Sequence, residues 1–190
     1  DFDSASLYKH LDLQPTNSLL DVCSAPGSKL FNCLDILNPV NCYANDIHEH
    51  RVELIKKMAN KLGYKEINYL NYDGVEIKEH IDKKFDRIML DVPCSGLGVI
   101  GRKPDLKFHI QPEDLDELQN IQLDLLNANA ELLKVGGIML YSTCTLNRKE
   151  NDRLIRRFLS YALDFSLIEE QTIVNEMGDC FYYAKLTKVK

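Results

Sequence analysis

Two cysteines of this 190-residue chain stand among neighbours that favour chemistry over core packing. Cys94 follows a proline in the segment 91–96 (Asp-Val-Pro-Cys-Ser-Gly), and Cys144 lies in the segment 141–146 (Tyr-Ser-Thr-Cys-Thr-Leu). A thiolate is a strong nucleophile, so the pair is a candidate for covalent catalysis. A lone cysteine is more often a small buried hydrophobe, and we keep that interpretation for three others. These are Cys33, Cys42 and Cys180.

Two thiols in one cleft have a chemical use on a pyrimidine base. Carbon 5 of cytosine is a poor nucleophile until a thiolate adds to carbon 6 and pushes electron density onto carbon 5. That carbon can then take a methyl group from S-adenosyl-L-methionine, after which proton removal and expulsion of the thiol need a helper group. Asp91 is placed to stabilise the intermediate near a ring nitrogen. A thiol with an ordinary pKa of about 8.5 is only partly ionised at neutral pH, so the site must help the nucleophile lose its proton.

A second set of residues suits a nucleoside cofactor. The segment Cys23–Lys29 carries small residues that let a ligand approach the backbone, and a predicted helix N-terminus follows it. It has neither a GxGxxG nor a GK[ST] pattern, which disfavours a nicotinamide dehydrogenase and a nucleoside triphosphate. Asp46 suits ribose hydroxyls, and Asp73 could accept from an adenine amino group. Each aspartate alone reads as an ordinary turn residue, but together at consecutive strand ends they favour nucleoside binding.

These residues must be positioned by an alternation of short apolar runs and helical segments. The runs predict strands over 18–22, 41–45, 67–70, 85–90 and 138–141 and a final pair, the last strand near 181–186. Helices are expected over 29–37, 48–62 and 149–159, with a longer one from Leu115 to Leu133 that follows Pro112. In helix 48–62 the apolar positions repeat at helical spacing and Gly63 provides the stop. The repeating positions are Val52, Ile55, Met58, Ala59 and Leu62.

Such an alternation predicts an α/β fold with a parallel sheet and helices on both of its faces. Ligands of these sheets lie beyond the carboxyl ends of the strands. The segments 23–29, 91–96 and 142–145, with Asp46 and Asp73, all fall at those ends. The pattern therefore predicts that the thiols and the nucleoside site share one edge of the sheet.

Length and composition limit the classes of protein. We expect a single domain over residues 1–190, a monomer, with a net charge of −6 and a pI of about 5.4. That charge argues against a broad basic surface for nucleic acid, so RNA contacts must come from a local cluster. The best cluster holds Arg102, Lys103, Lys107 and His109, although a solvated surface run explains it nearly as well. No CxxC pair suggests a metal site, and no apolar run nears the roughly 20 residues that span a bilayer, so we expect a cytoplasmic protein without membrane or metal partners.

Four segments carry a family resemblance. They are 23–29, 91–96, 102–105 (Arg-Lys-Pro-Asp) and 141–146 with Glu150 and Asn151, which we expect to pin the helix behind the Cys144 loop. Over about residues 3–185 the chain resembles the RsmB/NSUN family of RNA 5-methylcytosine methyltransferases. The resemblance implies a Rossmann-like, seven-stranded S-adenosylmethionine-dependent methyltransferase fold, mostly parallel with an antiparallel last strand. It also implies that Cys144 is the nucleophile and Cys94 the releasing residue. The implied cofactor-site residues are Cys23, Ser24, Ala25, Pro26, Gly27, Ser28, Lys29, Asp46, Arg51, Asp73 and Asp91.

The chain departs from the family pattern in places. Ser28 stands where the family often has a second glycine, and 178–181 (Gly-Asp-Cys-Phe) replaces the usual Asp-Gly-Phe-Phe. The RNA-recruiting region that precedes the catalytic domain in these enzymes is absent, so we expect a catalytic fragment or an unusually small enzyme. The run after Gly101 and the helix that follows look most like the bacterial ribosomal branch, which favours small-subunit ribosomal RNA over transfer RNA.

Two alternatives to RNA cytosine methylation stay open. A DNA cytosine methyltransferase shares the carbon 6 chemistry but uses the cysteine of its Pro-Cys motif, and the second cysteine of this chain speaks against it. A non-catalytic RNA-binding scaffold of the same fold has no chemical need for Lys29, Asp91, Cys94 and Cys144 together. Cysteine substitutions and cofactor binding discriminate these classes.

Overall fold

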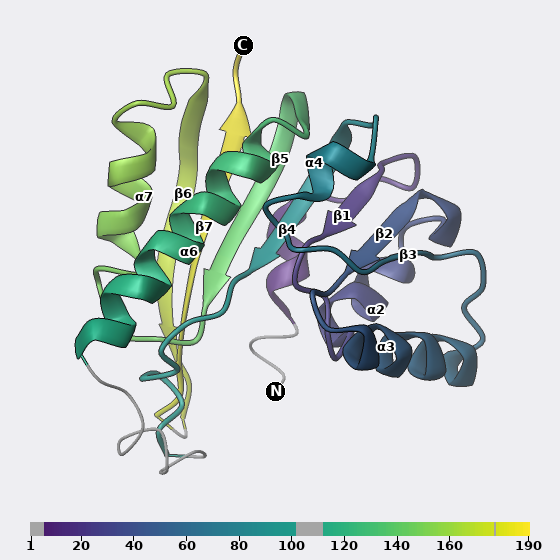
Figure 1. Cartoon of the computed structure of the whole chain (residues 1–190), viewed down its shortest axis with the longest axis horizontal. Coiled ribbons are helices and arrows are strands. Elements are labelled where there is room, and N and C mark those ends of the chain that lie inside the picture. Colours follow the sequence, from purple (N-terminus) through teal and green to yellow (C-terminus); the bar gives the residue numbers. More distant parts are fainter. Residues whose placement is uncertain (1–5, 102–111, 177) are drawn as a thin grey trace.

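One seven-stranded sheet organises the molecule (Figure 1). The computed structural model describes residues 6–101, 112–176 and 178–190. The strands lie in the order β3-β2-β1-β4-β5-β7-β6, with β1 to β5 paired in parallel and β7 antiparallel to both of its neighbours. This confirms the predicted α/β fold with its antiparallel last strand. The bounds are β1 Leu19–Asp21, β2 Cys42–Asn45, β3 Asn68–Leu70, β4 Phe85–Asp91, β5 Leu133–Thr143, β6 Phe165–Val174 and β7 Cys180–Lys188.

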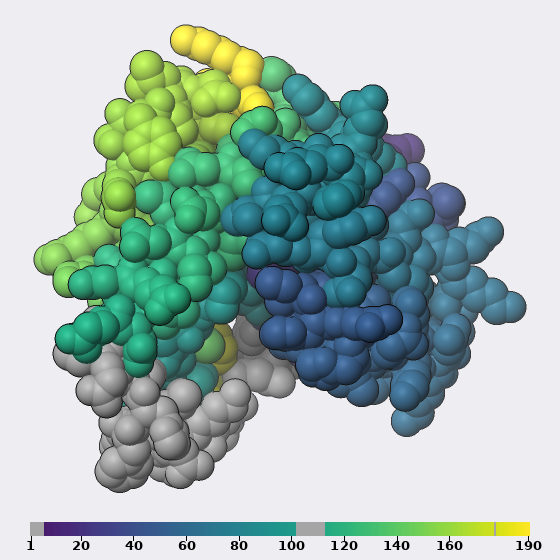
Figure 2. Space-filling model, viewed as in Figure 1, coloured from purple at the N-terminus to yellow at the C-terminus, as the bar shows by residue number. Residues whose placement is uncertain are grey.

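Helices cover both faces of the sheet, as the alternation predicted. On one face α4, α6 and α7 bury apolar side chains against the strands, and on the other face η1, α2 and α3 do so. Figure 2 shows the first face in space-filling form, where the teal atoms of the α4 segment adjoin the green atoms of α6. Within residues 6–101, 112–176 and 178–190, no helix combines the length and apolar character needed to cross a membrane. The bounds are η1 Leu7–Leu11, α2 Ser28–Leu34, η2 Pro39–Asn41, α3 Glu49–Leu62, α4 Ile77–His80, α6 Pro112–Ala130 and α7 Asp152–Leu159.

The helix between the fourth and fifth strands ends earlier than the sequence predicted. α6 stops at Ala130, and Leu133 begins β5 by pairing with Phe85. The next paired residue of β5 is Ile138, so the residues between form a bulge in which Gly136 takes a φ of 77°. The assignment of Leu132 and Leu133 to the helix was wrong because apolar spacing alone does not separate a helix end from a buried strand start.

Two other details of the helices differ from the expectations. α2 ends at Leu34 rather than at residue 37. In α3 the predicted stop is confirmed, since Gly63 caps the helix with a φ of 85°. Its apolar residues do not all face the core, however: Val52 is buried, whereas Met58 and Leu62 are 43% and 53% exposed. Helical spacing therefore identified the helix but overstated the width of its buried face.

The parallel strands bring their carboxyl ends to one edge of the sheet. Asp21 at the end of β1 is in register with Ala44 of β2, and Asp91 at the end of β4 is opposite Ser142 of β5. The segments that follow β1, β2, β4 and β5 are therefore neighbours at this edge. These are the segments in which the sequence placed the candidate residues.

Candidate active site

The structure brings the two candidate thiols into contact. Cys94 lies in the loop after β4 and Cys144 in the loop after β5, and the two strands are adjacent. Their Sγ atoms are 3.2 Å apart, and the backbone N–H of Cys144 donates to Sγ of Cys94 at 3.3 Å. The three cysteines that we expected in the core are buried; they are Cys33, Cys42 and Cys180.

Contact between the thiols changes the pKa of Cys94. The hydrogen bond to Cys144 raises the pKa of the Cys94 thiol far above its ordinary range, and burial raises it further. A negative charge on Cys144 acts in the same direction, because two thiolates this close repel each other. Cys94 therefore holds its proton more tightly than an ordinary thiol does.

Asp91 links the thiol loops to the segment after β1. Its carboxylate forms an ion pair with the ammonium of Lys29, the second residue of α2, and accepts a hydrogen bond from the Ser142 hydroxyl at 2.7 Å. The sequence assigned Lys29 to the cofactor site, and the structure places its side chain against Asp91. These two residues join the nucleoside half of the edge to the thiol half.

The buried carboxylate of Glu150 lies behind the two thiol loops. The sequence did not connect this residue with those loops. Glu150 accepts hydrogen bonds from the backbone and the hydroxyl of Ser95, from Gln122 of α6 and from Asn147. Asn151 fills the expected pinning role, because it accepts from the Thr143 hydroxyl and donates to the carbonyl of Thr145. The Glu150 carboxylate and the Asn151 amide therefore fix both thiol loops as well as the start of α7.

Gly98 is a second residue that the sequence did not single out. Its N–H donates to the carbonyl of Cys144 at 3.0 Å, and its carbonyl accepts from the N–H of Cys180 at 2.7 Å. A Cβ atom there would collide with the carbonyl oxygens of Cys180 and Cys144, the second at 2.8 Å. The closely spaced glycines 96 and 98 were the signal in the sequence for this close approach of three backbone segments.

The segment 23–29 is shaped by its own packing. Gly27 caps α2 with a φ of 100°, and a Cβ atom there would lie 2.7 Å from the ring of Phe31. The glycine is therefore required by the backbone and by the aromatic ring, in addition to any role in ligand approach. Arg51 of α3 closes the segment, because it donates to the carbonyl of Ala25 at 3.3 Å and forms an ion pair with Asp46 at 3.5 Å.

Asp46 and Asp73 both serve local turns. Asp46 accepts from the N–H of residue 48 and Asp73 from the N–H of residue 75, each at 3.1 Å. The ordinary turn interpretation thus holds for one oxygen of each carboxylate. Asn45, which the sequence did not single out, aligns the strand ends by donating to the carbonyls of Val22 and Tyr72. Asn45 therefore ties together the chain segments at the ends of β1, β2 and β3.

Two buried polar atoms at the end of β1 fit a polar ligand. Oδ1 of Asp21 and Oγ of Ser24 have no hydrogen-bond partner within the described residues. Burial raises the pKa of Asp21 to about 7; the Ser24 side chain and the Lys29 charge oppose this rise, whereas the charges of Asp91 and Asp46 add to it. Unpaired buried polar groups beside two further carboxyl groups, Asp46 and Asp91, suit a ligand that carries an ammonium and hydroxyl groups. S-adenosyl-L-methionine carries both.

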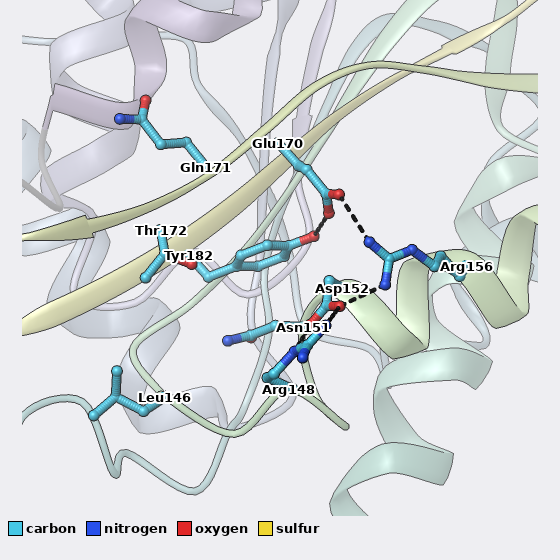
Figure 3. A pocket seen from close by; sticks show the side chains of 9 residues that line it. All are labelled: Leu146, Arg148, Asn151, Asp152, Arg156, Glu170, Gln171, Thr172 and Tyr182. Carbon is cyan, nitrogen blue, oxygen red and sulfur yellow. Dashed lines mark hydrogen bonds and ion pairs between the residues drawn. The ribbon is translucent and has the colours of Figure 1, made fainter.

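A polar cavity of about 330 Å³ lies next to the segment that follows Cys144, away from the β1 and β2 ends of the sheet (Figure 3). It opens between α7 and the ends of β6 and β7 that share this edge of the sheet. Arg148 and Arg156 both pair with Asp152, and the Tyr182 hydroxyl donates to Glu170 at 2.6 Å (Figure 3). The cavity lining is therefore balanced in charge.

A family model described as 16S rRNA methyltransferase RsmB/F matches residues 8–187. The chain belongs to this family. A probable ribosomal RNA small subunit methyltransferase B from Bacillus subtilis is 40% identical over 167 residues, which cover 87% of this chain and 37% of the relative. The ribosomal RNA small subunit methyltransferase B of Yersinia enterocolitica is 37% identical over 188 residues, 94% of this chain and 44% of the relative. The chain thus spans less than half the length of these curated relatives.

Solved structures confirm the fold of this RsmB/F family member. NSun6 from Pyrococcus horikoshii with SFG has a TM-score of 0.86 at 24% identity, over 98% of this chain and 52% of that one. Family membership also confirms the expected cofactor, S-adenosyl-L-methionine, for which the end of β1 provides fitting polar groups. The predicted RNA contacts Arg102, Lys103 and Lys107 lie outside the described residues.

Proposed function

We propose that this chain transfers a methyl group from S-adenosyl-L-methionine to carbon 5 of a cytosine in RNA, with small-subunit ribosomal RNA as the favoured substrate. The observation that carries the proposal is the contact between Cys94 and Cys144 at 3.2 Å, beside an aspartate that reaches the cofactor segment through Lys29. A single thiol would serve many reactions. Two thiols, of which one keeps its proton, match a reaction in which a thiolate must first add and later leave.

Cys144 begins the reaction by adding its thiolate sulfur to carbon 6 of the cytosine. Because Cys94 retains its proton, it can donate a hydrogen bond that stabilises the thiolate before the attack. The electron pair of the carbon 5–carbon 6 double bond moves toward carbon 5. Asp91, held by Lys29 and Ser142, is positioned to bind the polar edge of the base as charge builds up on the ring.

The cofactor supplies the methyl group as an electrophile on its positively charged sulfur. Residues at the ends of β1 and β2 would hold it, with Asp21, Ser24 and Asp46 as the polar contacts. After transfer, the carbon 5 proton passes to solvent, its electron pair re-forms the carbon 5–carbon 6 double bond, and Sγ of Cys144 leaves carbon 6 as a thiolate. Cys94 assists this step, because a thiol at 3.2 Å stabilises the sulfur that leaves with the electron pair.

A basic surface beside the thiol loops supports RNA as the substrate. Five exposed cations lie within ten residues directly after the Cys144 loop, although the whole chain carries a net charge of −6. Three of them are spaced four residues apart and line a shallow groove of about 210 Å³ with Gln119 of α6. We call these three, Lys149, Arg153 and Arg157, the α7 row. Such a row suits the phosphate backbone of RNA that leaves the cleft on the side opposite the cofactor.

Methylation of unmodified small-subunit ribosomal RNA by the purified chain, with a labelled methyl donor, tests the proposal. We expect the label in 5-methylcytidine after nuclease digestion, and no label in a DNA of the same sequence. Label on DNA, or on another position of the RNA, would refute the substrate or the chemistry. Absence of cofactor binding by calorimetry would favour the scaffold alternative.

A further inference from the structure

One carboxylate that does not face the cleft contacts both loops that carry the thiols. Glu150 has no exposed surface. It accepts from the backbone N–H of Ser95 at 2.9 Å and from the Ser95 hydroxyl at 2.6 Å. It also accepts from side-chain amides of Gln122 and Asn147, each at 2.9 Å. Its four hydrogen-bond contacts are all made to protein groups, which leaves no acceptor site for a substrate, so its effect must pass through its neighbours.

The four contacts match the capacity of an ionised carboxylate. Its two oxygens only accept hydrogen bonds and offer about four sites, and here four N–H or O–H groups occupy them. A glutamine at this position would keep the shape but would direct an amide NH₂ at groups that are themselves donors. The charge is therefore required for the geometry, since a neutral side chain of equal size leaves buried donors unpaired.

These contacts fix the separation of the two sulfur atoms. Ser95 directly follows Cys94, and its hydroxyl also contacts the hydroxyl of Thr145 at 2.7 Å, directly after Cys144. The Tyr141 hydroxyl donates to the backbone carbonyl of Glu150 at 2.7 Å, which ties the main chain at Glu150 to β5. Each thiol is thus one residue from a group held in the Glu150 network. Movement of either anchor would change the 3.2 Å contact between the sulfurs.

We infer that Glu150 is a positioning residue for methyl transfer, whose buried carboxylate holds the Cys94 and Cys144 loops at the separation that lets Cys94 stabilise the Cys144 thiolate. The inference rests on the proposed thiol chemistry. It adds a residue that neither binds cofactor nor contacts RNA. Its loss should therefore change the rate of the chemical step and the reactivity of Cys144, while cofactor affinity stays unchanged.

The test compares Glu150→Gln with Asp86→Asn in the full chain. Asp86 is a matched control, because its carboxylate also accepts from a backbone N–H, a hydroxyl and a side-chain nitrogen, but at the opposite end of β4. For Glu150→Gln we expect kcat to fall roughly 100-fold, the loss typical of a small misplacement of reacting groups. KM for RNA and the Kd of the cofactor should stay within about twofold of the wild type, since both sites lie outside the network.

The pH dependence of Cys144 alkylation, measured by peptide mass spectrometry, separates the two roles. It should not change if Glu150 only stabilises the fold. In Glu150→Gln the pH profile of Cys144 alkylation should move to higher pH, because the stabilising hydrogen bond from Cys94 is loosened. Asp86→Asn should leave the profile unchanged. A folded Glu150→Gln protein with the wild-type kcat and profile would overturn the inference, as would an equal loss in Asp86→Asn.

Ser95→Ala covers the case in which Glu150→Gln does not fold. This change removes one hydroxyl and keeps the backbone contact, so a smaller loss of about tenfold in kcat with unchanged cofactor affinity is expected. An unchanged kcat in Ser95→Ala would contradict the inference. If the wild type does not methylate RNA while the alkylation profile still depends on Glu150, the proposed function fails and the positioning of the thiols stands.

Discussion

Replacing Asp21 by asparagine should stabilise the ligand-free protein most strongly at alkaline pH. Asp21 ends β1 with 1% of its surface exposed, and its Oδ1 lacks a partner within the described residues. Burial raises the pKa of this carboxyl from 3.8 to about 7, and neighbouring carboxylates contribute in the same direction. At high pH the folded protein must bury a negative charge there, whereas asparagine carries none.

The pKa determines both the sign and the size of the effect. A carboxyl whose pKa is higher in the folded than in the unfolded protein holds its proton more tightly when folded, so its contribution to stability is full below about pH 4. That contribution is lost as the pH rises from about 4 to about 7. A difference of about 3 pKa units corresponds to about 4 kcal/mol, which is a ceiling because local relaxation and water penetration reduce the cost of buried charge.

Urea unfolding at pH 4.5 and pH 8, followed by circular dichroism, measures the effect. The gain in the free energy of unfolding from Asp21→Asn should be up to about 3 kcal/mol larger at pH 8 than at pH 4.5. Asp86→Asn is the control, because both the folded and the unfolded pKa of Asp86 lie below pH 4.5 and the variant should lose a similar free energy of unfolding at both pH values. Burial opposes ionisation of Asp86, but hydrogen bonds from Ser18 and Lys134 outweigh it and lower its pKa to about 2.

Cofactor binding completes this test. Asp21→Asn should weaken the binding of S-adenosyl-L-methionine at least tenfold, or about 1.4 kcal/mol, because a buried unpaired acceptor loses its charge. A stability difference between the variant and the wild type that is independent of pH would refute the account of Asp21. Unchanged cofactor affinity would remove Asp21 from the cofactor site.

Two further changes test the loops and the RNA surface. Gly98→Ala should destabilise the protein by about 1–3 kcal/mol in urea unfolding, because its Cβ atom has no room beside the carbonyl of Cys144; a loss below about 0.5 kcal/mol would contradict this packing. Arg153→Gln with Arg157→Gln should lower the slope of log affinity for single-stranded RNA against log salt by about 1.4, at about 0.7 for each phosphate contact. Lys57→Gln with Lys61→Gln, on the exposed side of α3, should leave that slope unchanged. Equal slopes in both double variants would exclude the α7 row as the RNA surface.

The sequence predicted much of the fold because its strands are short apolar runs bounded by turn residues. The register of β4 with β5 then brought Cys94 and Cys144 together, as the motif positions at the strand ends suggested. The misplaced end of α6 has a physical cause. Leu132 and Leu133 continue the apolar spacing of the helix, and only pairing with Phe85, far away in the sequence, makes Leu133 a strand residue.

The positioning residues could not be derived from local sequence. Glu150 contacts Ser95 across 55 residues and Gln122 across 28, so its environment exists only after the sheet has formed. The sequence placed Asp21 only within the predicted strand 18–22, and its unpaired oxygen becomes visible only when the strand ends are aligned. Lys29 was assigned to the cofactor, whereas its ion pair with Asp91 depends on the adjacency of β1 and β4.

Mapping the covalent adduct between protein and RNA tests the central claim most directly. Cys94→Ala should accumulate a complex in which Cys144 stays bonded to carbon 6, because the thiol that assists its departure is missing. After digestion, mass spectrometry should find the nucleotide on the peptide that contains Cys144, and Cys144→Ala should give neither adduct nor methylated RNA. A nucleotide attached to Cys94 in a Cys144→Ala enzyme that still methylates RNA would contradict the account.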